Sequence, residues 1–98
     1  MSGSTRTRAD LDVRRRKILF RSWHRGLREM DVLMGQFADA EIGNLSEEEL
    51  SDFELLIEVP DRDLLGWLTG EQEVASNYDT PVFRRLKAFH THVSPIHV

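Results

Sequence analysis

Apolar residues recur at steps of three and four in five stretches of the chain, with charged residues filling the positions between them. This spacing gathers the apolar side chains on one face of a helix, where they can pack against other helices. We therefore predict an all-α fold, a small five-helix bundle forming a single domain. The five faces are Leu11, Ile18, Leu19 and Ser22; Leu27, Met30, Leu33 or Met34, Phe37 and Ala38; Leu50, Phe53, Leu56 and Ile57; Leu64, Leu65, Trp67 and Leu68; and Val82, Leu86, Phe89 and Val93.

Polar caps and glycines predict where the first two helices begin and end. Asp10 or Asp12 can cap the first helix, which should run to about His24. Gly26 suits the position just past that end, where a positive φ costs glycine little. The second helix should follow at once, from about Leu27 to Ala40, and Gly35 inside it indicates close packing.

The other three helices carry similar signals. Ser46 and Glu49 have the spacing of a capping box, and that helix should end near 59–60. Asp61 can cap the fourth helix, and Gly70 would end it. Residues 71–77 then form a connector, and Asp79 or Thr80 caps a fifth helix with Pro81 at its first position and a stop at 94–95.

A chain of 98 residues has length for one domain. The polar, Arg-rich residues 1–9 are expected to form a disordered N-terminal arm, residues 10–94 the helical bundle domain, and residues 95–98 a tail. Trp67 fits either the core of this domain or a second anchor for a partner.

The absence of cysteine removes disulfides, thiolate metal sites and a cysteine nucleophile. No apolar run approaches the ~20 residues that cross a bilayer, and the N-terminus lacks the apolar segment of a secretory signal. We therefore expect a bacterial cytoplasmic protein with no membrane insertion.

The net charge of −4 is divided unevenly along the chain. Residues 1–28 hold nine Arg or Lys against two Asp, whereas residues 29–80 hold one Arg against fifteen Asp or Glu. The basic first helix leaves open an antitoxin-like or nucleic-acid-binding regulator that contacts phosphates. The acidic stretch would repel a polyanion, so we favour no nucleic-acid partner.

The sequence shows no reaction centre. His90 and His92 are two residues apart, which would point them to different helical faces, and no histidine pair has the i, i+4 spacing of a metal site. The glycines are isolated and form no phosphate-binding loop. We expect no metal and no enzyme, with His24 and His97, like the other two histidines, at surface or structural positions.

Charged side chains crowd the junction of the first two helices. Arg21, His24, Arg25 and Arg28 lie around it, and Glu29 and Asp31 follow in the next turn. These charges suit the two helix dipoles, but capping needs only one residue of each sign. Trp23 lies there too, and Trp and Arg are frequent anchors of protein interfaces. Helix capping alone is one interpretation of this cluster, and the excess charges and Trp23 lead us to predict a docking surface for another protein.

The residues 25–29, Arg-Gly-Leu-Arg-Glu, match the Arg-Gly-x-x-Glu signature of the succinate dehydrogenase flavinylation factors. Asp31 and Phe37 follow at spacings that resemble members of that family. Leu55-Leu56 and then residues 61–68, Asp-Arg-Asp-Leu-Leu-Gly-Trp-Leu, are similar to its second block. The resemblance covers about 14–68 well and the last helix loosely.

The resemblance implies a five-helix bundle that acts as an assembly factor, or chaperone. Such a protein binds the flavoprotein subunit of succinate dehydrogenase or fumarate reductase and promotes covalent attachment of FAD to a histidine of that client. It implies a partner-binding surface and no stably bound cofactor, and we expect a monomer. The implied surface comprises Arg25, Gly26 and Glu29, with Asp31, Trp23 and Arg28 as further members.

Overall fold

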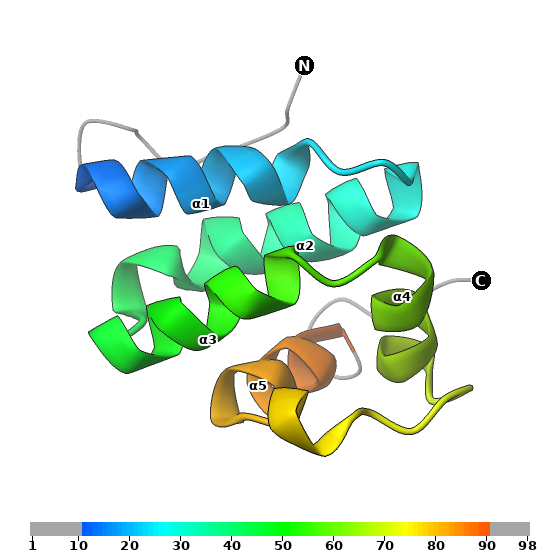
Figure 1. The fold of residues 1–98 in the computed structure, drawn as a ribbon. Coiled ribbons are helices and arrows are strands. Elements are labelled where there is room, and N and C mark those ends of the chain that lie inside the picture. The colour runs from blue at the N-terminus through cyan, green and yellow to red at the C-terminus, as the bar shows by residue number, and fades with distance from the viewer. Residues whose placement is uncertain (1–10, 91–98) are drawn as a thin grey trace. The chain divides into compact units, whose positions relative to one another are not determined.

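The computed structural model describes residues 11–90, which contain five α-helices and two short 3-10 helices (Figure 1). No strand occurs in this range, which confirms the all-α prediction. The chain divides into two compact units, with the boundary between Ser46 and Glu47. The single domain therefore stays a prediction, and the expected arm at 1–9 and tail at 95–98 lie outside the described residues.

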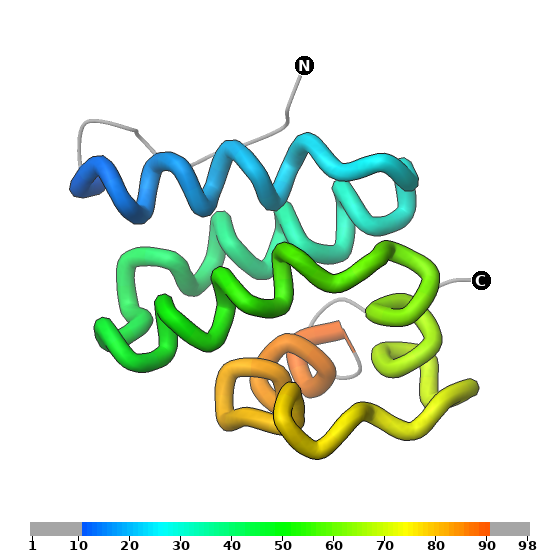
Figure 2. Tube along the Cα trace, viewed as in Figure 1, coloured from blue at the N-terminus to red at the C-terminus, as the bar shows by residue number. Residues whose placement is uncertain are grey.

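The first unit is built on an antiparallel pair of helices, α1 (Val13–Trp23) and α2 (Arg28–Glu41), which a short turn joins (Figures 1 and 2). Asp12 caps α1, since its carboxylate accepts a hydrogen bond of 2.9 Å from the Arg15 backbone N–H. Both helices lie within about one residue of their predicted bounds. Their facing apolar residues are buried, and the largest are Ile18, Met30, Met34 and Phe37.

Arg15 fastens the far end of this helix pair. A 3-10 turn, η2 (Ile42–Asn44), follows α2 directly. The Arg15 guanidinium donates to the carbonyl oxygens of Ile42 at 3.0 Å and Leu45 at 2.6 Å, and it forms an ion pair with Asp12 at 3.0 Å. These bonds satisfy the carbonyls of the first residue of η2 and of the residue that follows η2.

The second unit contains α3 (Glu47–Ile57), α4 (Asp61–Thr69), the 3-10 turn η3 (Ser76–Tyr78) and α5 (Pro81–Ala88). Helices α3 and α5 pack together, and Arg85 of α5 forms an ion pair of 2.9 Å with Glu49 of α3. Trp67 is buried, with its ring 5.4 Å from that of Tyr78 and 6.3 Å from that of Phe83. Of the two interpretations of Trp67, the structure favours core.

One predicted boundary in this unit is wrong, and another is not tested. Pro60 occupies the N-cap position of α4, so Asp61 is the first helical residue and its charge lies in the first turn, where the helix dipole favours it. The α-helical part of α5 ends at Ala88, and the chain continues as a wider π turn at 89–90, up to the end of the described residues, so the predicted stop at 94–95 is not tested. Val93 and the stop itself lie outside the described residues. Thr80 caps α5 as predicted, accepting from the Phe83 N–H at 3.3 Å.

Gly70 ends α4 in the left-handed conformation, with φ of 86°. A Cβ added at this position would meet no atom within 4 Å, so substitution would cost only backbone strain. We expect Gly70→Ala to lower the free energy of unfolding by about 1 kcal/mol. Urea unfolding would measure this, and an unchanged midpoint would contradict the assignment of Gly70 as the helix stop.

Candidate functional site

The turn between α1 and α2, residues 24–27, contains the first three residues of the signature and begins one residue before it, and Arg28 and Glu29 start α2. His24 caps the C-terminus of α1, and its backbone N–H donates to the Arg21 carbonyl at 3.3 Å. Leu27 holds the N-cap position of α2, where its carbonyl accepts from Met30 and Asp31, both at 3.0 Å. Arg25 and Gly26 lie between the two caps.

Gly26 does not use the backbone freedom that we predicted for it. Among the described residues, Gly70 is the one glycine with a positive φ, so Gly26 is not a left-handed helix stop. The prediction of a C′ glycine at this position is wrong because α1 ends earlier, at Trp23. Backbone conformation therefore does not require glycine at position 26. A requirement for glycine there would have to be steric, through the space that a side chain would fill.

Asp31 closes the turn from the first helical turns of α2. Its carboxylate Oδ1 accepts a hydrogen bond from the backbone N–H of Arg25, six residues earlier. Charge-assisted hydrogen bonds of this kind are stronger than those between neutral groups. Asp31 is half-buried, and this contact gives it a positioning role in the turn.

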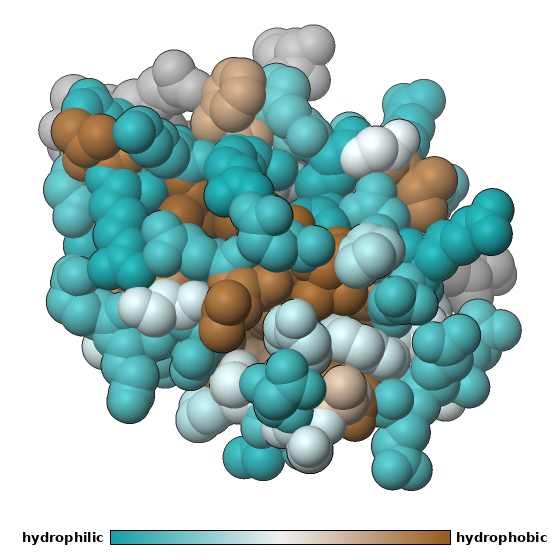
Figure 3. Space-filling model, viewed as in Figure 1, coloured by the Kyte–Doolittle hydropathy of each residue, from teal (hydrophilic) through white to brown (hydrophobic). Residues whose placement is uncertain are grey.

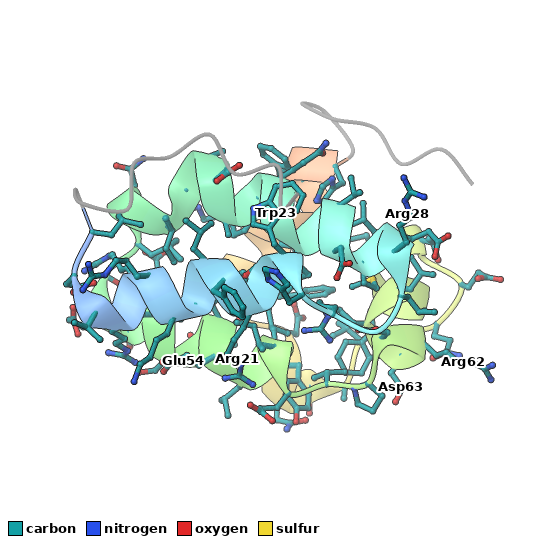
Figure 4. All side chains as sticks on the ribbon, turned by 90° about the horizontal axis from the view of Figure 1, so that it is seen from above. Arg21, Trp23, Arg28, Glu54, Arg62 and Asp63 are labelled. Carbon is teal, nitrogen blue, oxygen red and sulfur yellow. The ribbon has the colours of Figure 1, made fainter. Side chains whose placement is uncertain are left out.

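The rest of the signature faces solvent. Gly26, Leu27, Arg28 and Glu29 are exposed, and Arg25 is half-buried. Figure 4 shows Arg28 at the start of α2, pointing away from the helices. Arg25, Gly26, Arg28 and Glu29 thus form the surface that we call the signature turn. The structure brings them together on one accessible corner of the first unit.

Trp23 packs against α2 and supports the turn from within the helix pair. An added Cβ at Gly35 would come within 3.0 Å of three atoms of the Trp23 ring, Cδ2, Cε2 and Cε3. Gly35 therefore provides the space for the indole, which confirms the expectation of close packing there. Trp23 is half-buried, and its Nε1 is buried without a hydrogen-bond partner within the described residues. Its contact with a partner stays a prediction.

We expect Asp31→Ala to loosen the turn. The Arg25 N–H would lose its acceptor, which should lower the free energy of unfolding by about 1–2 kcal/mol. Asp63→Ala is a matched control, since Asp63 is an exposed carboxylate in the first turn of α4. Urea titration of both variants measures the difference, and equal midpoints would contradict the positioning role.

Other kinds of site have no support within the described residues. No group of three or more potential ligands could hold a metal ion in the part of the chain from 11 to 90. His92 and His97 lie outside it, so the prediction of no metal is not tested there. Among the helices of the same range, none is long and apolar enough to span a membrane.

The sequence of this chain is similar to known assembly factors. The model of the family described as flavinator of succinate dehydrogenase matches residues 16–90. The FAD assembly factor SdhE of Acetobacter pasteurianus is 40% identical over 77 residues, which are 79% of this chain and 71% of that protein. The mitochondrial succinate dehydrogenase assembly factor 2 of Dictyostelium discoideum is 36% identical over 76 residues. These cover 78% of this chain and 54% of that protein, so the chain spans about half of the mitochondrial relative.

Proposed function

Because the chain belongs to the family of succinate dehydrogenase flavinators, we propose that it binds the flavoprotein subunit of succinate dehydrogenase, or of fumarate reductase. In this role it promotes covalent attachment of FAD to a histidine of that client. The observation that carries the proposal is the signature turn, whose Gly26, Arg28 and Glu29 are exposed on a corner where Asp31 accepts a hydrogen bond from the Arg25 N–H. The proposed location is the bacterial cytoplasm.

The signature turn suits recognition of a protein surface. Arg25, Arg28 and Glu29 place both signs of charge around a residue without a side chain. Charges arranged in this way fix the register of a complex and suppress wrong partners more than they add affinity. Gly26 lets a partner approach the backbone closely. We propose that Asp31 and Trp23 hold this surface in shape and that Arg25, Gly26, Arg28 and Glu29 contact the client.

A helper of this kind contributes orientation, because the bond forms between the client's histidine and the client's own FAD. Holding two reacting groups in a near-attack geometry can lower a barrier by up to about 7–11 kcal/mol. By binding the client as a monomer, the chain would favour the arrangement in which histidine and flavin meet. We propose that it acts without a cofactor of its own and is not itself an enzyme.

Deletion of the gene tests this function. Covalent flavin remains on a protein in a denaturing gel and fluoresces under ultraviolet light. We expect the flavoprotein band to lose most of its fluorescence in the deletion strain and to regain it when the gene is returned. Equal fluorescence with and without the gene would contradict the proposal.

A further inference from the structure

A basic groove runs along α1, away from the signature turn. Among the described residues, Arg16, Lys17, Phe20 and Arg21 of this helix line a hollow of about 400 Å³. Phe20 keeps 49% of its surface exposed, which is unusual for a large aromatic side chain. The space-filling view shows mostly hydrophilic side chains over α1, with small apolar patches between them (Figure 3).

Phe20 forms a fixed platform in this groove. Its ring stacks on the ring of His24, with centroids 3.9 Å apart and planes inclined by 15°. The His24 Nδ1–H donates to the Phe20 carbonyl at 2.6 Å, which fixes the imidazole. His24 is also the last residue before Arg25, so this stacked pair lies between the groove and the signature turn along the chain. Arg21 and Trp23 point to opposite sides of the helix, which separates the groove from the Trp23 packing (Figure 4).

The charge of α1 is of one sign. Between Val13 and Trp23 the helix carries five Arg or Lys and no carboxylate. Arg15 donates a hydrogen bond to a carbonyl of the 3-10 turn η2 and forms an ion pair with Asp12. Arg16 and Lys17, in contrast, are exposed at the groove. A ligand complementary to this surface needs carboxylates for the cations and an apolar group for Phe20.

We propose that this groove binds an acidic peptide segment of the same flavoprotein client, with an apolar side chain of that segment resting on Phe20. This inference rests on the proposed function and adds a second contact surface to the signature turn. Exposed ion pairs are individually weak, so the carboxylates would steer association more than they hold the complex. Burial of Phe20 by an apolar side chain would supply the affinity that salt does not screen.

A nucleic acid fits the groove less well than a peptide does. The positions from Arg16 to Arg21 span only about 8 Å along the helix axis. Single strands are held by successive aromatic platforms, and this groove has Phe20 with its stacked histidine. The chain as a whole carries a net charge of −4, which opposes a polyanion.

Titration of the purified flavoprotein subunit with the whole chain tests the groove. We expect the double variant Arg16→Glu, Lys17→Glu to bind at least tenfold more weakly at about 0.1 M salt, mainly through slower association, and to recover much of this difference at about 0.5 M. Phe20→Ala should lose affinity at both salt concentrations. Arg62→Glu and Leu55→Ala are matched controls, since Arg62 is exposed and Leu55 keeps 52% of its surface exposed on α3.

The possible results distinguish a failure of the groove proposal from a failure of the proposed function. Wild-type affinity in the groove variants, with binding lost in Gly26→Arg, would overturn the groove and leave the function standing. A wild-type chain that fails to bind the flavoprotein would overturn both. Variants that lose only binding to a single-stranded oligonucleotide would assign the groove to nucleic acid and overturn the peptide. Circular dichroism checks the fold, and if the Glu variant unfolds, the Gln variant at both positions decides instead.

Discussion

Gly35→Ala lowers the thermal midpoint of the protein, although alanine is the better helix former. In an open helix interior this change would stabilise by about 1 kcal/mol. Here the added Cβ would come within 3.0 Å of the Trp23 ring, which has no room to retreat without losing its packing on α2. Overpacking of this kind costs about 1–3 kcal/mol, and each kcal/mol shifts the midpoint by about 4–8 °C in a chain of this size.

A double-mutant cycle with Trp23→Leu isolates the clash. A smaller side chain at position 23 leaves space for the Cβ, so Gly35→Ala should cost little or even stabilise in that background. Calorimetry of the four proteins measures the coupling between the two positions. Independent, additive effects would show that the indole does not pack on Gly35.

Gly26→Arg abolishes binding to the flavoprotein while helical content stays at the wild-type level. Gly26 is exposed and does not use a positive φ, so an arginine there adds no backbone strain and enters no core. A bulky, positively charged side chain at position 26 would instead prevent the client from contacting Arg25 and Arg28. We expect at least a hundredfold loss of affinity in isothermal titration.

Gly43→Arg is the matched control. Gly43 is also exposed and also lacks a positive φ, but it lies in the turn that follows α2, at the other end of the helix pair. It should bind the flavoprotein as the wild type does. Equal loss in both variants would mean that added charge, not the position of the corner, prevents binding.

Local signals explain why the helices could be predicted from the sequence. Asp12 and Thr80 cap the helices that they were expected to cap, and Gly70 ends α4 in a left-handed conformation. Each of these devices lies within a few residues of the backbone group that it satisfies, so spacing alone reveals it. The signature residues 25–29 are likewise contiguous, and the family match over 16–90 confirms the resemblance.

Contacts across the turn could not be predicted from spacing. The bond from the Arg25 N–H to Asp31 spans six residues and depends on how α2 leaves the turn. The fit of Trp23 over Gly35 depends on the alignment of two helices, so the sequence could indicate close packing at Gly35 but not its partner. The sequence did not indicate Phe20 as a site residue, because a single aromatic residue on a basic helix is usually interpreted as a core residue.

Site-specific photo-crosslinking tests the central claim, that the signature turn touches the client, most directly. A photoreactive amino acid replaces Arg28, which is exposed in the turn, and in a second protein it replaces Glu71, which is exposed beyond α4. We expect position 28 to crosslink to the flavoprotein subunit and position 71 not to crosslink. A crosslink from position 71 with none from position 28 would contradict it.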